Sequence, residues 1–290
     1  MPRRWQLRRP RHRALAAGIQ SNMTDNTQRF AGRAENYDLY RQRYPTKQVL
    51  AQLREWCGLT PQWLVADIGA GTGMLTEVFL GNGNPVFAIE PNADMRDQMH
   101  KTFDGLGKCW PSLEIIEATA EATTLPDASV DLVAAGRAFH WFDTDGALAE
   151  FRRILKLTGW VALVSVGRAS LDPMDQIDPT LIDQLQHYEC LLTDYGTDYR
   201  YIRAGYRVHE HMAELFDGEF HQANFLGEQR LNWEAFRGQT LSLSVVPAPD
   251  DPRHETFIRQ LQLFFDRFAQ DGVLTQPTNC WISAGRFRMQ

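Results

Sequence analysis

The stretch Val65-Ala66-Asp67-Ile68-Gly69-Ala70-Gly71-Thr72-Gly73 decides the fold of this chain. Residues 65–68 predict a short buried strand, and the three alternate glycines predict a tight turn into a helix that starts at Met74. A second apolar strand, 86–89, ends at the carboxylate of Glu90. A strand, a glycine-rich turn, a helix and a second strand that ends in an acid form a βαβ unit that binds a nucleoside. The acid is placed to accept hydrogen bonds from two ribose hydroxyls.

The glycine spacing argues against a dinucleotide. The dinucleotide fingerprint is G-x-G-x-x-G, but Met74 and Thr76 occupy the positions where a third glycine would follow. An NAD-dependent oxidoreductase is therefore disfavoured, and tight binding of a nicotinamide would be needed to revive it. An ordinary tight turn without a ligand is the other interpretation, and the acid at Glu90 argues against it.

Strands and helices alternate on both sides of this unit. A helical region, 34–57, is broken at Tyr44-Pro45, and further strands are predicted around Ile115-Ile116, at 130–135 and at 160–166. Asp143-Thr144 can cap a helix that we expect to end at Gly159. This alternation predicts a parallel, doubly wound sheet.

The rhythm changes after the fifth strand. Asp178-Pro179 can start a helix, residues 226–247 have strand-like and turn-like character that includes 241–245, and 257–268 reads as an amphipathic helix before a last strand at 279–287. We therefore divide the chain into four parts: a disordered basic extension at 1–22, a core at 23–168, a helical cover at 169–220 and the completion of the sheet at 221–290.

Composition and charge limit the function. The apolar fraction of 43% supports a core, and no apolar run approaches the length of a membrane span. The four scattered cysteines predict neither a metal site nor a disulfide framework, so we expect a reducing, cytoplasmic location.

Residues 1–22 carry six arginines and no acid, which leaves 24 basic against 36 acidic residues in the remainder. That acidic body argues against nucleic-acid binding. This basic segment, residues 1–22, can result from translation that starts upstream of Met23, can be a disordered extension, or can be a transit-like peptide. A secretory signal and a nucleic-acid-binding arm are disfavoured.

The tyrosines gather on either side of the predicted core. They are Tyr37, Tyr40 and Tyr44 before it, and Tyr188, Tyr195, Tyr199, Tyr201 and Tyr206 after the fifth strand. Tyrosine combines apolar area with a polar tip, which suits a surface that closes over a ligand. Plain packing of helices on a sheet would explain them equally well.

The pattern D-x-G-x-G-x-G headed by Asp67 resembles motif I of class I S-adenosylmethionine-dependent methyltransferases. Such a cofactor has no pyrophosphate, and its ammonium and sulfonium groups suit an acid and free carbonyls at a strand end. The likeness extends over residues 29–168 and includes 29–37, Glu90-Pro91-Asn92-Ala93-Asp94-Met95, Thr119-Ala120-Glu121 with Leu125-Pro126, and Ala138-Phe139-His140-Trp141-Phe142-Asp143. The last motif is similar to the methyltransferase type 11 group and its trans-aconitate-methyltransferase-like branch.

The resemblance implies an α/β fold with a doubly wound, mostly parallel, seven-stranded Rossmann-like sheet and a helical cover inserted after the fifth strand. It also implies S-adenosylmethionine as cofactor. The implied cofactor-binding residues are Asp67, Gly69, Gly71, Gly73, Glu90, Pro91, Met95, Ala120 and Glu121. In this set Asp67 binds the amino-acid end of the cofactor and Glu90 binds the ribose. Pro91, Met95, Ala120 and Glu121 surround the adenine. The chain departs from the pattern at Thr119, where aspartate is frequent, and at Arg137, where glutamine is frequent.

The resemblance places His140 and Trp141 near the transferred methyl group, His140 as a base or positioning residue and Trp141 as a pocket wall. A structural histidine is the alternative. The expected function is methyl transfer to a small molecule, with a carboxylate oxygen as one candidate acceptor. The expected substrate residues are Tyr37, Tyr44, Arg200, Arg203 and Arg207. The three arginines share a face if their segment is helical, and they could bind an anion or form a solvated face. A non-catalytic, S-adenosylmethionine-binding regulatory protein is the alternative function. The oligomeric state stays open.

Overall fold

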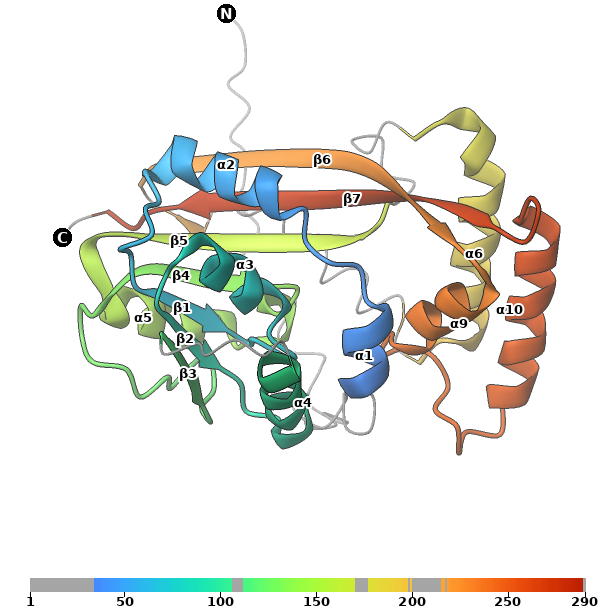
Figure 1. The fold of residues 1–290 in the computed structure, drawn as a ribbon, viewed down its shortest axis with the longest axis horizontal. Coiled ribbons are helices and arrows are strands. Elements are labelled where there is room, and N and C mark those ends of the chain that lie inside the picture. The colour runs from blue at the N-terminus through green and yellow to red at the C-terminus, as the bar shows by residue number, and fades with distance from the viewer. Residues whose placement is uncertain are drawn as a thin grey trace, which may run out of the picture.

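The computed structural model describes residues 34–105, 112–169, 177–197, 199, 215–216 and 218–288. Within these ranges, one seven-stranded sheet carries helices on both faces (Figure 1). The predicted basic extension at 1–22 and the arginines Arg200, Arg203 and Arg207 lie outside the described residues.

The sheet is mostly parallel, as predicted. Its strands are β1 Val65–Ile68, β2 Val86–Ile89, β3 Leu113–Ile116, β4 Val130–Gly136, β5 Leu155–Arg168, β6 Phe220–Leu231 and β7 Leu274–Gly285. They are arranged in the order β3-β2-β1-β4-β5-β7-β6, and only β7 runs antiparallel to its two neighbours. The chain leaves β1 towards β2 on one side and returns from β3 to β4 on the other. The strand order therefore reverses between β1 and β4, and the crevice at their carboxyl ends is where such sheets bind ligands.

Helices cover both faces of the sheet because the strands are apolar on both. They are α1 Ala34–Tyr40, α2 Thr46–Cys57, α3 Met74–Asn82, α4 Ala93–Gly105, α5 Thr144–Ile154, α6 Ile182–Tyr195, α9 Trp233–Leu241 and α10 His254–Phe268, with short 3₁₀ turns η2 Phe139–Trp141 and η4 Pro179–Leu181. Buried side chains of α2, α3 and α4 share one core cluster with strand residues such as Val65 and Leu132. Side chains of α5 share another with Ala66 and Val133 on the opposite face.

The break at Tyr44-Pro45 and the helix start at Asp178 are confirmed, and two other predictions are wrong. Helix α5 ends at Ile154, not at Gly159, because Leu155 is already extended and pairs with Val130 across a register shift. The segment 241–245 was predicted to be strand-like but is the end of α9 and the turns that follow it. The side chain of Asn232 caps α9 by accepting a hydrogen bond from the Ala235 N–H at 2.9 Å. This cap favours a helix, which outweighs the alternation of apolar and polar residues in 241–245.

Helices α6, α9 and α10 form a separate helical lobe beyond one end of the sheet (Figure 1). Their buried side chains form a third core cluster, which Leu231 and Leu274 at the ends of β6 and β7 join. The two long strands thus run from the sheet into the lobe and connect the two parts. In the described residues, the helices are all too short or too polar to cross a bilayer.

Candidate functional site

The three glycines of the motif I loop are needed for different reasons. All three have positive φ, at +67° for Gly69, +60° for Gly71 and +87° for Gly73. A Cβ on Gly69 would lie 2.6 Å from Ala138 Cβ, and one on Gly73 would lie 2.7 Å from the Phe103 ring. A Cβ on Gly71 would meet nothing within 4 Å. Gly69 and Gly73 therefore permit packing within the protein, whereas Gly71 faces space that a ligand can use.

The carboxylate of Glu90, at the carboxyl end of β2, is held by the same loop. Its Oε2 accepts the Gly71 N–H at 2.8 Å, and its Oε1 accepts the Asn92 N–H at 2.9 Å. Burial raises the pKa of Glu90 against the lowering effect of these two N–H groups and of Arg96. A carboxylate has about four acceptor positions, so two remain for a ligand such as a ribose diol.

Asp67, at the carboxyl end of β1, is fully buried. Its Oδ2 accepts the Thr76 hydroxyl at 2.6 Å, while its Oδ1 has no hydrogen-bond partner among the described residues. Burial raises the pKa of Asp67 to about 7, the Thr76 hydrogen bond opposes that rise, and the charge of Glu90 adds to it. A buried acceptor without a partner is costly, so Oδ1 suits a cationic donor from a ligand.

A small hollow, partly open to solvent, lies at the carboxyl ends of β1 and β4. Its lining residues come from the motif I loop, the end of β4 and the segment around α1: Tyr37, Tyr44, Asp67, Gly69, Ala70, Gly71, Thr72, Met74, Leu75, Gly136 and Arg137. The hollow is at the position that the strand order indicates. The orphaned Oδ1 of Asp67 and the open space at Gly71 fit an adenosyl cofactor with a cationic amino-acid end.

Two arginines control the charge on the α1 side of the hollow. The Arg41 guanidinium lies 5.0 Å from the centre of the Tyr37 ring, and that of Arg137 lies 5.6 Å from it. Burial would raise the pKa of the Tyr37 hydroxyl, but the charges of Arg137 and Arg41 outweigh it and hold this pKa below its usual value. This side of the hollow is therefore electropositive, opposite in sign to the side at Asp67 and Glu90.

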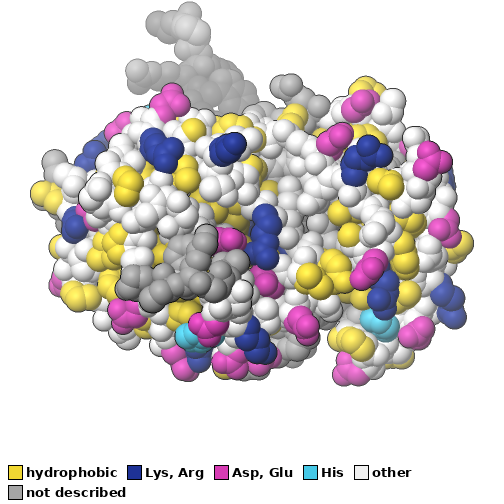
Figure 2. All heavy atoms as spheres, in the orientation of Figure 1, with side chains coloured by type: hydrophobic (Ala, Val, Ile, Leu, Met, Phe, Trp, Pro, Cys, Tyr) yellow, Lys and Arg dark blue, Asp and Glu magenta, His cyan; other side chains and the backbone are white. Residues whose placement is uncertain are grey.

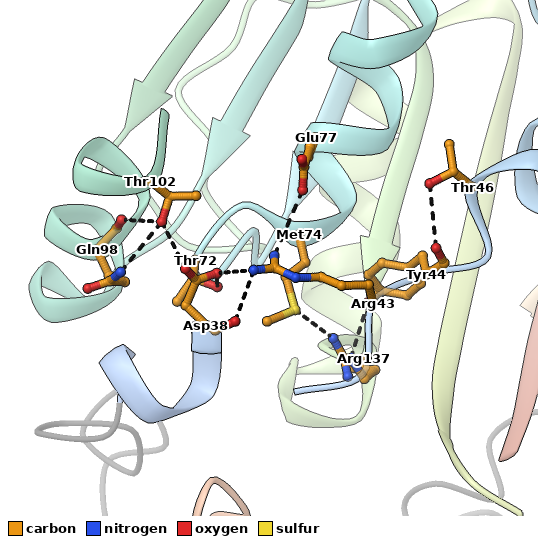
Figure 3. A network of polar contacts seen from close by, with 10 residues as sticks. All are labelled: Asp38, Arg43, Tyr44, Thr46, Thr72, Met74, Glu77, Gln98, Thr102 and Arg137. Atoms are coloured by element: carbon orange, nitrogen blue, oxygen red, sulfur yellow. Dashed lines mark hydrogen bonds and ion pairs between the residues drawn. The ribbon is translucent and has the colours of Figure 1, made fainter. Parts of the chain in front are cut away.

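Helix α1 is fastened over the motif I loop by the carboxylate of Asp38 (Figure 3). Its Oδ1 accepts from Arg43 at 3.0 Å and from the Thr72 hydroxyl at 3.4 Å, and its Oδ2 accepts from the Thr102 hydroxyl at 3.0 Å. Arg43 also lies 3.8 Å from Glu77 on α3. One carboxylate therefore connects α1 with the loop and with α4.

The structure brings some of the predicted site residues to the hollow and leaves others around it. Those that line it are Tyr37, Tyr44, Asp67, Gly69 and Gly71. Glu90 does not line the hollow itself but accepts a hydrogen bond from Gly71, which does. Gly73 is the N-cap of α3. Met95 and Ala120 are buried, Pro91 accepts a hydrogen bond from Arg96 through its carbonyl, and Glu121 accepts the Asp143 N–H at 2.9 Å.

His140 and Trp141 lie in η2, directly beyond the end of β4. Their ring centres are 4.5 Å apart, and neither residue lines the hollow in the described part of the chain. Trp141 instead packs against the core of the helical lobe. These two residues therefore stand at the junction between the sheet and the lobe.

Sequence reasoning missed the site contributions of Asp38, Thr76 and Gly136. A Cβ on Gly136 would lie 2.5 Å from the Tyr44 hydroxyl, so this glycine admits the tyrosine to the end of β4. Thr76 could have been found, because it lies in the first turn of α3, the helix that follows the motif I loop. The hydrogen bonds of Asp38 join it to residues 34 and 64 positions away in the chain, so no local sequence pattern predicts them.

Comparison with known proteins finds relatives of the central part of the chain. Residues 66–163 match the type 11 family described as a methyltransferase domain. An uncharacterized methyltransferase of Schizosaccharomyces pombe is 32% identical over 130 residues, covering 44% of this chain and 49% of that protein. One of Mycobacterium bovis is 31% identical over 135 residues, covering 47% and 51%. The chain thus spans about half the length of the curated relatives that it matches.

A solved structure extends the likeness. A candidate type II methyltransferase from Anaeromyxobacter dehalogenans is similar with a TM-score of 0.59 and 26% identity, covering 85% of this chain and 98% of that one. Together with the loop, the buried acid and the strand order, these likenesses support one assignment. Residues 66–163 therefore match a methyltransferase domain, and the likenesses support S-adenosylmethionine as the cofactor.

Proposed function

We propose that this protein transfers the methyl group of S-adenosylmethionine to a small-molecule acceptor. The observation that carries the proposal is the buried Oδ1 of Asp67, which has no hydrogen-bond partner among the described residues and lies near the open space at Gly71. In the proposed arrangement, Asp67 binds the ammonium group and Glu90 the ribose hydroxyls, with Gly69, Gly71 and Gly73 shaping the loop. Pro91, Met95, Ala120 and Glu121 surround the adenine.

When bound, S-adenosylmethionine supplies an electrophilic methyl group on a sulfonium. The task of the protein is then to align the acceptor and to exclude water. Trp141 supplies aromatic surface at the junction between sheet and lobe, and Tyr37 supplies it at the hollow. The charges of Arg41 and Arg137 beside Tyr37 favour an anionic acceptor. We include a carboxylate oxygen, and the trans-aconitate-like branch, in the proposal. Arg200, Arg203 and Arg207 are proposed to assist.

The face shown in Figure 2 favours a small acceptor over a nucleic acid. On the face shown in Figure 2, Lys and Arg side chains are interspersed with Asp and Glu side chains among the described residues. A nucleic-acid footprint would need basic side chains to cluster along a face. A small molecule that enters the hollow does not need such a surface.

Calorimetry with S-adenosylhomocysteine tests the cofactor site, and a metabolite panel with methyl-labelled cofactor tests transfer. We expect tight binding and labelled product with at least one acid. Binding without transfer to any acceptor would favour the regulatory alternative. No binding would overturn the proposed site.

His140→Ala separates two classes of acceptor. An ionised carboxylate is already a nucleophile at neutral pH, so the variant should lose only about tenfold in rate through poorer positioning. A hydroxyl acceptor needs a base. The loss should then reach about 10²–10⁴-fold, and an acid limb in the wild-type pH–rate profile at about pH 6–7 should disappear in the variant.

A further inference from the structure

Two backbone carbonyls follow the point at which β2 leaves the sheet. Strand β2 ends at Ile89, and the Glu90 N–H still donates to the Ile116 carbonyl at 3.0 Å. The carbonyl groups of Glu90 and Pro91 come after this bond, in the turn that leads to α4 (Figure 1). Backbone carbonyls away from water need donors. The turn that carries the Glu90 carboxylate therefore needs a hydrogen-bond donor from another element.

Arg96, in the first half of α4, supplies that donor. Its Nη1 donates to the Glu90 carbonyl at 2.9 Å and to the Pro91 carbonyl at 2.7 Å, and its Nη2 donates to Glu117 at 2.6 Å. Only 15% of the Arg96 side chain is exposed, against 74% of the Glu117 side chain. An ion pair with so exposed an acid contributes little. The two carbonyls of the turn are therefore the contacts that matter for Arg96.

The charge of Arg96 also acts on the Glu90 carboxylate. Burial raises the pKa of Glu90, and two backbone N–H groups together with Arg96 oppose that rise. The other titratable groups that interact with Glu90 are Asp67 on β1 and Tyr37 on α1, whose pKa values its charge raises. Glu117 lies on the far side of the guanidinium. Arg96 thus supplies positive charge on the α4 side of a mainly acidic group of side chains.

We propose that Arg96 is a positioning residue of the cofactor site, which acts through Glu90 and does not itself contact the cofactor. By holding two successive carbonyls, it fixes the turn from which the Glu90 side chain projects towards the Gly71 N–H. By its charge, it favours the ionised carboxylate that accepts hydrogen bonds from the ribose hydroxyls. The proposal rests on the proposed role of Glu90 in binding the ribose.

A double-mutant cycle with S-adenosylhomocysteine tests whether Arg96 acts through Glu90. Isothermal titration calorimetry is carried out on the full chain as the wild type, Arg96→Met, Glu90→Gln and the double variant. Arg96→Met should weaken binding roughly 5–30-fold, within the range of coupling between groups that contact each other. In the Glu90→Gln background the same substitution should change the affinity by less than about 2-fold, because no charged carboxylate is left to orient.

The pH dependence of binding separates this role from general support of the fold. Loss of the Arg96 charge favours the protonated form of Glu90, so the affinity of Arg96→Met should begin to fall at a higher pH than that of the wild type as the pH is lowered. Asp67, with a pKa of about 7, titrates in both proteins, so the difference between their curves reports on Glu90 and should vanish in the Glu90→Gln background. Arg96→Lys, which keeps the charge but not the planar fork, should restore the pH dependence and only part of the affinity.

Lys101→Met is the matched control, since Lys101 is an exposed cation on the same helix. Its affinity and pH dependence should equal those of the wild type. Equal weakening by Arg96→Met in both backgrounds would show a merely structural role and overturn the proposal, and so would an unchanged affinity. If circular dichroism shows that Arg96→Met does not fold, Arg96→Lys takes its place in the cycle, and its loss must likewise vanish in the Glu90→Gln background. Wild-type protein that does not bind S-adenosylhomocysteine would overturn the proposed cofactor site itself.

Discussion

At the scale of single residues, the site depends on two carboxyl groups in different surroundings. Glu90 is held by two backbone N–H groups, whereas Asp67 interacts with Thr76 and keeps one oxygen without a partner among the described residues. The first arrangement favours the charged form and the second opposes it. Asp67 therefore gains more than Glu90 when a cationic ligand arrives.

The raised pKa of Asp67, about 7, predicts proton release on cofactor binding. In the cofactor-free protein, Asp67 holds a proton between about pH 4 and 7 that an unfolded chain has lost, so its contribution to stability falls as pH rises across that range. An ammonium group at Oδ1 would ionise it. Calorimetry of S-adenosylhomocysteine binding at pH 6, in buffers of different ionisation enthalpy, should show release of up to about one proton. Asp67→Asn should abolish the release, and buffer-independent enthalpies in the wild type would contradict this.

Glu90→Gln should weaken binding of S-adenosylhomocysteine by about 1.5–3 kcal/mol, because charge-assisted hydrogen bonds to the ribose are lost. Glu117→Gln is the control, since Glu117 is a mostly exposed acid that pairs with Arg96 near the same sheet edge. Calorimetry should find the control unchanged. Equal affinities for all three proteins would remove Glu90 from the site.

Gly71→Ala and Gly73→Ala should separate binding from folding. Each strains a left-handed backbone by about 1–2 kcal/mol. At Gly73 the new methyl group also meets Phe103 and Met99, which adds roughly 1–3 kcal/mol of overpacking. Urea denaturation should show Gly73→Ala as the less stable protein, and calorimetry should show Gly71→Ala as the poorer binder. The reverse order would mean that the space at Gly71 is not used by the cofactor.

At the scale of elements, the sequence predicted the sheet well and the site only in part. Strands β1 to β4 could be located because short apolar runs bounded by turn-forming or acidic residues are a local sequence pattern. The start of β5 was misplaced, since the bulge beside Val130 is decided by pairing and not by the residues around Gly159. Arg137 could not be assigned, because its direction depends on a positive φ and on Tyr44, 93 residues away.

Helix α1 should control cofactor exchange through Asp38. Release of the cofactor past α1 must break the hydrogen bonds of Asp38 to Arg43, Thr72 and Thr102 (Figure 3). Asp38→Ala should therefore accelerate dissociation of S-adenosylhomocysteine by roughly tenfold, as expected from about 1–1.5 kcal/mol of hydrogen bonding. Stopped-flow fluorescence measures the rate, and Glu35→Ala, an exposed acid on the same helix, should leave it unchanged. An unaltered rate in Asp38→Ala would show that exchange does not require α1 to open.

At the scale of the whole molecule, sheet and helical lobe should unfold together, because β6 and β7 belong to both. Phe236 is almost fully buried in the lobe, so Phe236→Ala should cost about 3–5 kcal/mol. Circular dichroism and tryptophan fluorescence should shift by the same amount in denaturant, whereas Leu263→Ala, an exposed site on α10, should change little. Separate transitions would mean that the lobe folds on its own.

Helix α1 also contacts the lobe on its other side. The Tyr40 hydroxyl donates to Glu234 at 3.3 Å, and a Cβ on Gly238 would collide with the Tyr40 ring. The seven-residue helix α1 therefore contacts both the loop proposed to hold one reactant and the lobe beside which the other is proposed to bind. Kinetically, such a shared helix favours compulsory-order turnover, in which the cofactor enters first and its demethylated form leaves last. S-adenosylhomocysteine should accordingly inhibit competitively against S-adenosylmethionine and non-competitively against the acceptor.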